Sequence, residues 1–276
     1  MTRSLDRSQV GAQCAVSSVV ERLVYTEEAV GSIPTPRTMS EISIVYEDAN
    51  LLVINKPAGL IVHPKNATDN QPSVCDWVQA HYPHLRDVGE PFSASGTPLP
   101  RWGILHRLDK ETSGLLLIAK NDDVFYFLKK QFRERTISKS YQALVYGQPK
   151  EPAGTISFPL GRIGLKRTTQ IVGKKLIDSK ESVTEYRTLK NFEKYTLLDV
   201  SPKTGRTHQI RVHLKSINCP IAGDSVYAPK GWQPPQGLNR LFLHAYKLSF
   251  VTPDGKALTV ECGLPDDLQK VLSVLE

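Results

Sequence analysis

Asp109 stands in surroundings that are unusual for a carboxylate. It belongs to the polar stretch HRLDKETSG (106–114), which runs directly into the apolar stretch LLLIA (115–119). Placing an ionised carboxylate against buried chain is costly unless a cation accompanies it. A carboxylate that keeps its charge beside an arginine is suited to act as a nucleophile or a base. From this spacing alone, a structural salt bridge near a turn is the simpler interpretation.

Two further polar stretches interrupt apolar chain, KSYQA (139–143) and GRTHQIRVHL (205–214). The opening VYEDANLLVINKPAGLIVHP (45–64) and the late RLFLHAYKLSF (240–250) accompany them. With these motifs in this order, the sequence resembles the RluA family of RNA pseudouridine synthases, of the RluA/RluD type, from residue 42 to residue 264.

The resemblance implies a role for four residues. Asp109 matches the catalytic aspartate of the family, and Arg211 matches the basic residue that pairs with it. Tyr141 matches the active-site tyrosine that contacts the target base. Arg107 matches an arginine that reaches into the RNA beside the flipped-out nucleotide.

The implied reaction suits these side chains. Uridine becomes pseudouridine when its bond from the anomeric carbon to the base nitrogen breaks and the uracil rejoins through carbon 5, so no cofactor is required. Asp109 could attack the anomeric carbon or remove a sugar proton to give a glycal, and the sequence leaves both routes open. We expect Arg211 to hold Asp109 through a planar, two-pronged contact. Tyr141 offers a flat face for the uracil and a hydroxyl for the proton lost from carbon 5.

The charge of the chain agrees with an RNA partner, either ribosomal or transfer RNA. There are 35 Lys and Arg residues against 28 Asp and Glu, a net charge of +7. Within 161–217, basic residues outnumber acidic ones by 13 to five. This stretch is either a cradle for the phosphate backbone, in which Lys203 and Arg206 bind RNA, or a solvated face.

Several other residues are less informative. We expect no metal site, because the pair His81 and His84 lacks a third ligand. Trp77 is expected in the core, and Thr207 and Gln209 are expected to orient Arg211. The remaining motif histidines are expected to make structural hydrogen bonds, with a direct acid or base role as the alternative; they are His106, His208 and His213.

Many predicted strands with few helices indicate an α+β fold. We expect a large, mostly antiparallel mixed sheet in two halves, with the active site in the cleft between them. Helices are predicted after Ser73 and over 122–135, the second with Asn121 as its cap and with Val124, Phe127, Leu128 and Phe132 on its apolar face. A loop is predicted over 85–101. Strands are predicted over 42–46, 51–55, 115–119, 140–146, 155–158, 168–172, 183–189, 195–201, 241–250 and 258–262.

The composition also bears on the class of protein, the cellular compartment and the number of domains. No apolar run is long enough to span a membrane, and the four cysteines form no close pair, as expected in a reducing cytoplasm. We expect a monomer with one catalytic domain over 39–276 and without an amino-terminal S4-like RNA-binding domain. Residues 1–38 are interpreted as an untranslated extension upstream of Met39 or as a disordered leader. The competing functions are a non-catalytic RNA-binding or ribosome-assembly protein, and a hydrolase that pairs Asp109 with a second carboxylate such as Glu111.

Overall fold

The structure is a computed structural model that describes residue 39 and residues 41–94, 96–163, 166–169 and 176–276. The interpretation of residues 1–38 falls outside the described residues. Among the helices in the described ranges, none is long and apolar enough to cross a membrane.

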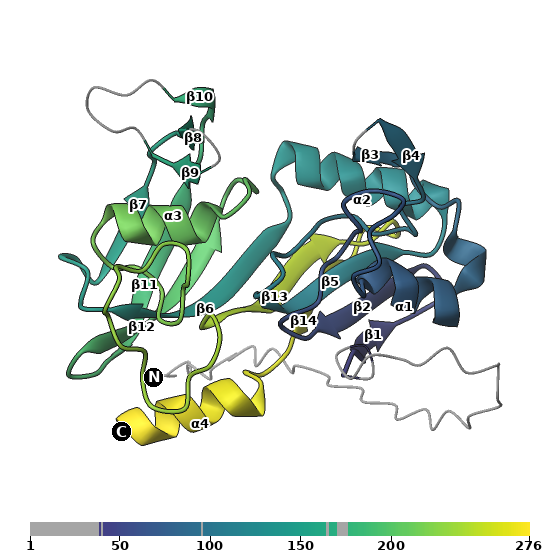
Figure 1. Cartoon of the computed structure of the whole chain (residues 1–276). Coiled ribbons are helices and arrows are strands. Elements are labelled where there is room, and N and C mark those ends of the chain that lie inside the picture. The colour runs from purple at the N-terminus through teal and green to yellow at the C-terminus, as the bar shows by residue number, and fades with distance from the viewer. Residues whose placement is uncertain (1–38, 40, 95, 164–165, 170–175) are drawn as a thin grey trace, which may run out of the picture. The chain divides into compact units, whose positions relative to one another are not determined.

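A nine-stranded sheet forms the centre of the fold (Figure 1). Its order is β1 (Ser43–Glu47), β2 (Leu51–Lys56), β5 (Ser113–Ala119), β13 (Leu243–Val251), β6 (Ser138–Tyr146), β12 (Tyr195–Pro202), β11 (Thr184–Asn191) and β7 (Ala153–Ile156), while β14 (Ala257–Glu261) pairs with β13. Only β5 and β13 run parallel, and the other pairs are antiparallel. The predicted α+β fold with a large, mostly antiparallel sheet is confirmed.

The central strands are apolar on both faces because both faces of the sheet are covered. On β5, Leu116 and Ile118 belong to one hydrophobic cluster, while Leu115 and Leu117 belong to another. Successive side chains of a strand point to opposite faces, so burial on both sides produces a continuous apolar run. The 115–119 run was recognisable as a buried strand for this reason.

Gly114 allows β5 to begin beside β13. It pairs with Ala245 in the parallel register and has a φ of +119°. A Cβ atom at this position would lie 2.2 Å from the carbonyl oxygen of Ala245. Only glycine fits here, and its lack of a side chain lets the start of β5, directly after the loop that carries Asp109, lie against the backbone of β13.

Two of the helices follow the local signals. Helix α1 (Val74–His81) begins with a capping box in which Ser73 and Asp76 each bond the other's backbone N–H. Helix α2 (Asp122–Glu134) begins at Asn121, whose side chain accepts the N–H of Val124. Trp77 lies in the core, as predicted.

The predicted apolar face of α2 is partly wrong. Phe127 is 37% exposed, whereas its neighbour Phe125 is buried. Gln131 is also buried and makes two hydrogen bonds to the backbone of Val251, at 2.7 and 3.0 Å. The face of α2 that packs on the sheet therefore includes Phe125 in place of Phe127. It also includes the polar Gln131, because this side chain hydrogen-bonds the backbone of β13.

Other elements were not predicted. Helices α3 (Gln209–Ser216) and α4 (Asp266–Leu275) are charge-rich, and neither has a side-chain cap. A short 3₁₀ helix, η1 (Pro83–Leu85), ends where the predicted loop over 85–101 begins. The loop contains the hairpin of β3 (Phe92–Ala94) and β4 (Thr97–Leu99), whose strands are too short to show an alternation. A small sheet adds β8 (Leu160–Ile163), β9 (Lys166–Thr168) and β10 (Ile177–Lys180). The predicted strand over 168–172 meets the end of β9, and residues 170–172 lie outside the described ranges.

Candidate active site

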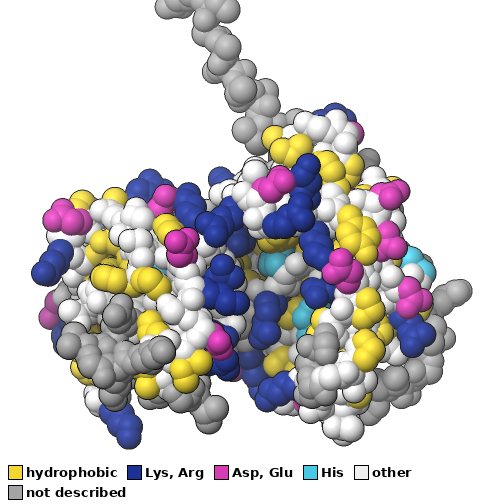
Figure 2. All heavy atoms as spheres, turned by 90° about the horizontal axis from the view of Figure 1, so that it is seen from above, with side chains coloured by type: hydrophobic (Ala, Val, Ile, Leu, Met, Phe, Trp, Pro, Cys, Tyr) yellow, Lys and Arg dark blue, Asp and Glu magenta, His cyan; other side chains and the backbone are white. Residues whose placement is uncertain are grey.

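A cavity of about 620 Å³ opens beside the central strands. Figure 2 shows Lys and Arg side chains gathered along a hollow of the surface. Its described lining comes mostly from the loop before β5, the end of α2, the start of β6 and the turn between β12 and α3, with single residues from elsewhere, among them Leu243 of β13. Seven lining residues are Lys or Arg and one is acidic, namely Arg101, Arg107, Arg133, Arg135, Lys139, Lys203, Arg206 and Asp109.

The loop around Asp109 is fixed by its neighbours. Leu108 and Thr112 are buried on either side, and the N–H of Thr112 donates to the backbone carbonyl of Asp109 at 3.1 Å. The next carbonyl, that of Lys110, accepts the N–H of Gly59 at 2.8 Å and the Nζ of Lys56 at 3.2 Å. The KPAG bend thus supports the loop, which leaves the Asp109 side chain 19% exposed.

Lys56 is a buried residue that sequence reasoning missed. Its Nζ also donates to the carbonyls of Pro57 and Leu60, both at 2.8 Å. Burial lowers the pKa of Lys56 to about 7, although the carboxylates of Glu111 and Asp109 act in the opposite direction. Three backbone carbonyls thus accept from Nζ, as many as a charged ammonium has hydrogens to donate.

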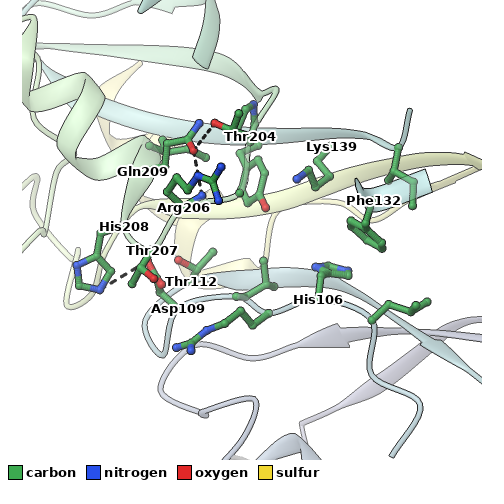
Figure 3. Close-up of a pocket in the computed structure, with 18 of the residues that line it drawn as sticks. His106, Asp109, Thr112, Phe132, Lys139, Thr204, Arg206, Thr207, His208 and Gln209 are labelled. Carbon is green, nitrogen blue, oxygen red and sulfur yellow. Dashed lines mark hydrogen bonds and ion pairs between the residues drawn. The ribbon is translucent and has the colours of Figure 1, made fainter. Parts of the chain in front are cut away.

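Asp109 lies near two donors. Its Oδ2 is 3.8 Å from Nη1 of Arg211 and 3.9 Å from Nε2 of His208. Both donors come from the GRTHQIRVHL stretch, in which His208 ends the turn before α3 and Arg211 lies in the first turn of that helix. Figure 3 shows Asp109, Thr112 and His208 on one side of the cavity, with Lys139, Phe132 and His106 on the other.

The expected two-pronged contact between Arg211 and Asp109 is wrong. Arg211 makes that contact with Asp224, through Nε to Oδ2 and Nη2 to Oδ1, both at 2.8 Å. Burial opposes both charges, but the pairing outweighs it, so the pKa of Asp224 lies below its ordinary value and that of Arg211 above. Asp224 orients the guanidinium, whose remaining nitrogen faces Asp109.

Asp224 carried a weak signal in the sequence. It is a lone carboxylate that directly follows the apolar stretch IAG (221–223), whereas Asp109 precedes its apolar stretch. No spacing rule connects it to Arg211, because the loop after α3 must fold back to bring them together. Backbone N–H groups of Val226 and Tyr227 complete its hydrogen bonds at 2.9 and 3.0 Å.

Tyr141 lines the cavity from β6 and is 9% exposed. Burial, and then the charge of Asp109, raise the pKa of its phenol above the ordinary value. The hydroxyl therefore keeps its proton at neutral pH. It can donate a hydrogen bond and present a ring face, but an ionised phenolate is disfavoured at this position.

The cations of the cavity come mostly from outside the basic stretch. Of the residues in 161–217, only Lys203 and Arg206 are Lys or Arg in the described lining. Others in that stretch form ion pairs with carboxylates, as Arg187 does with Asp199 and Lys190 with Glu276. Lys203 itself is 2.8 Å from Glu185. Arg107 is exposed at the cavity, as its implied role requires.

The motif histidines make the expected hydrogen bonds. His106 accepts the N–H of Leu117 through Nε2 at 3.1 Å, and the ring of His213 lies between the Thr184 hydroxyl and the carbonyl of Phe158. His208 differs, because its Nε2 faces Asp109 while its Nδ1 is 2.8 Å from the Tyr227 hydroxyl.

Gln209 does not orient Arg211 as expected. Its amide group bonds the backbone N–H of Arg206, the carbonyl of Val183 and the hydroxyls of Thr184 and Thr204. It stabilises the turn before α3, while Asp224 performs the orienting role. Thr207 lines the cavity.

In the part of the chain that the structure describes, no group of three or more His, Cys, Asp or Glu side chains is placed to hold a metal ion. The His81 ring is instead 2.8 Å from the Trp77 carbonyl and stacks on the Trp77 ring.

Comparison with known proteins matches this arrangement to one family. Residues 50–216 match the family described as RNA pseudouridylate synthase. The chain is 40% identical over 240 residues to "Ribosomal large subunit pseudouridine synthase D" of Nitrosomonas europaea, covering 85% of this chain and 65% of that protein. It is 39% identical over 264 residues to "Uncharacterized RNA pseudouridine synthase" of Aquifex aeolicus, covering 91% and 80%.

Solved structures agree with the sequence relatives. "Human RNA Pseudouridylate Synthase Domain Containing 4" superposes with a TM-score of 0.64 at 28% identity, covering 84% of this chain and 92% of that one. "Human RNA Pseudouridylate Synthase Domain Containing 1" gives a TM-score of 0.65 at 25% identity, covering 86% and 90%. The resemblance seen in the motifs is confirmed, and this chain belongs to the RNA pseudouridylate synthase family.

Proposed function

We propose that this chain isomerises uridines of large-subunit ribosomal RNA to pseudouridine, with Asp109 as the catalytic carboxylate. One observation carries the proposal: among the described residues, Asp109 is the only carboxylate in a cavity lined by seven cations. The cations suit a polyanion, and the carboxylate suits attack on its sugar. Relatives named as ribosomal large subunit synthases support the choice of RNA.

The chain's own groups account for each step. Lys and Arg side chains bind the phosphates, and Arg107 helps to hold the target nucleotide outside its helix, at a cost of roughly a few kcal/mol. Asp109 then attacks the anomeric carbon or removes a sugar proton. Arg211, fixed by Asp224, stabilises the carboxylate. Tyr141 offers its ring and a protonated hydroxyl to the loosened uracil.

The atoms of the reaction balance without a further reagent. One carbon–nitrogen bond breaks, one carbon–carbon bond forms, and a proton leaves carbon 5 while the base nitrogen gains one. Nothing is oxidised or reduced, so the proposed reaction needs no cofactor. The proposal includes action as a monomer in the cytoplasm, which size-exclusion chromatography with light scattering and cell fractionation would test.

The hydrolase alternative lacks support in the geometry. A glycosidase-like mechanism needs a second carboxylate across the site. Glu111, the nearest in sequence, does not belong to the described lining, and its charge acts on Lys56 instead.

Release of tritium from RNA labelled at carbon 5 of uracil tests the proposal. The substrate is total RNA from a strain that lacks the gene, fractionated into ribosomal and transfer RNA. We expect release from large-subunit RNA by the wild type and by Asp87→Asn, an exposed control, and none by Asp109→Asn. RNA affinity should change less than about threefold, because phosphate contacts dominate it.

Other results would overturn parts of the proposal. Salt-sensitive binding without release from any RNA would favour a non-catalytic RNA-binding protein. Release from transfer RNA alone would keep the reaction and change the substrate. Equal release by Asp109→Asn would remove Asp109 from the chemistry.

A further inference from the structure

His208 occupies a position that a structural role does not explain. It is the residue before α3, and its backbone is left-handed, with a φ of +58°. Its ring touches Tyr227 on one side and faces Asp109 on the other. A histidine needed only to begin a helix would not have to direct its second nitrogen into the cavity.

Tyr227 fixes the ring of His208. The two rings meet edge to face at 84°, with centroids 5.6 Å apart, and the Tyr227 hydroxyl is 2.8 Å from Nδ1. Tyr227 is 4% exposed and packs with Leu160 and Val212. This packing holds the hydroxyl in place.

Electrostatics select one arrangement of protons in this pair. Burial raises the pKa of Tyr227 to about 12 and lowers that of His208, so the phenol is protonated and the imidazole neutral at neutral pH. If Tyr227 donates to Nδ1, then Nε2 carries the hydrogen and presents it to the Asp109 carboxylate. The opposite arrangement would turn a lone pair toward that negative charge.

The two donors near Asp109 approach the same atom. Arg211 and His208 both reach Oδ2, at 3.8 and 3.9 Å. In the described part of the chain, no side chain bonds Oδ1. The two distances exceed those of hydrogen bonds, and catalytic contacts commonly shorten when the substrate closes the site.

We propose that His208 is a positioning residue for the isomerisation: its Nε2–H, fixed by Tyr227, acts with Arg211 to hold Oδ2 of Asp109, which leaves Oδ1 for the ribose of the target uridine. This inference rests on the proposed function. It assigns a role to Tyr227 as well, because without its hydroxyl the imidazole can carry its hydrogen on either nitrogen.

Two amides separate the positioning role from a structural one. The amide nitrogen of glutamine can replace Nε2 of histidine, and that of asparagine can replace Nδ1. His208→Gln therefore keeps a donor toward Asp109, whereas His208→Asn keeps only the contact with Tyr227. Asparagine also tolerates the left-handed backbone better than glutamine, so a structural role predicts that the asparagine variant is the better enzyme.

The experiment measures single-turnover tritium release and RNA affinity for the wild type, His208→Gln, His208→Asn and Tyr227→Phe. We expect His208→Asn to be slower by about tenfold to a hundredfold and His208→Gln by only a few-fold, with RNA affinity unchanged in both. Tyr227→Phe should fall between them. Thermal unfolding confirms that each variant is folded.

The outcomes are distinct. Glutamine faster than asparagine supports the positioning role. Asparagine equal to or faster than glutamine, or all variants equal to the wild type, overturns it while the isomerase activity stands. An inactive wild type would remove the proposed function and this inference together.

Discussion

Thr112 carries a hydroxyl that the fold does not satisfy. It is the one buried side-chain oxygen or nitrogen of the described residues without a hydrogen-bond partner, and it lines the cavity three residues after Asp109. We expect Thr112→Val to raise the free energy of unfolding by about 1 kcal/mol, because the desolvated hydroxyl is removed and the volume is kept.

Urea unfolding measures this change. Thr112→Ser is the matched control, since it keeps the hydroxyl and loses a methyl group, and it should lower stability. A valine variant less stable than the wild type would show that the hydroxyl contributes a bond to the fold.

Asp224 makes the stability of the fold depend on pH in the acid range. Its pKa is lowered in the folded protein, so its pairing with Arg211 stabilises the fold above the ordinary carboxyl pKa and is lost as pH falls through the lower folded value. We expect Asp224→Asn to lower the free energy of unfolding by about 3 kcal/mol at neutral pH, because it leaves Arg211 buried without a counter-charge.

The same comparison repeated at decreasing pH checks the cause. The gap between wild type and Asp224→Asn should narrow as the wild-type carboxylate becomes protonated. A gap that stays constant into acid would mean that packing around Asp224, and not its charge, is responsible.

The contact between Asp109 and Arg211 could be anticipated from the sequence, but its geometry could not. A carboxylate against an apolar run demands a cation, and the motifs point to Arg211. The demand does not say which carboxylate receives the two-pronged contact. Asp224 receives it because it is fully buried, whereas Asp109 must keep part of its surface open to the cavity.

Gly114 lies where the loop that carries Asp109 enters the sheet. We expect Gly114→Ala to lower the free energy of unfolding by more than about 3 kcal/mol, since the new Cβ would collide with the backbone of Ala245. Gly255→Ala is the control. Gly255 also has a positive φ, +81°, but a Cβ there meets nothing within 4 Å, so only the backbone strain of about 1 kcal/mol applies.

Equal unfolding midpoints for the two alanine variants would contradict this argument. They would show that strain at a positive φ accounts for the whole effect and that the close approach of β5 and β13 can relax.

Elements with strong local signals were predicted, and those made by tertiary contacts were not. Strand β5 and helix α2 show a continuous apolar run and a capped, periodic pattern. Helix α3 has no capping side chain, and its polar residues do not mark one exposed face, because six of its eight residues, Gln209, Arg211 and His213 among them, are buried. Its sequence therefore does not distinguish a helix from a loop.

RNA binding should depend on the cavity cations and not on the basic stretch as such. We expect affinity to fall steeply with salt, and Arg133→Gln to reduce the slope of log affinity against log salt by about one. Lys190→Gln, which alters an exposed cation of the 161–217 stretch paired with Glu276, should leave the slope unchanged. Filter binding over a range of salt concentrations measures both.

If Lys190→Gln reduced the salt slope more than Arg133→Gln, the RNA-binding surface would lie on the 161–217 stretch and not at the cavity. The sequence could supply the sign of the charge and its distribution along the chain. It could not show which cations are neutralised by neighbours, since the pairs join residues as far apart as Lys190 and Glu276.

The place of β13 in the sheet has a consequence for how the protein is made. Strands β5 and β6 follow each other in the sequence, yet β13, which begins at Leu243, lies between them. During synthesis one edge of β5 and one edge of β6 stay unpaired until β13, which begins about 100 residues after β6 starts, has left the ribosome. These strand edges are therefore exposed to misassociation until β13 inserts, and the cavity, which Leu243 at the start of β13 helps to line, is completed only then.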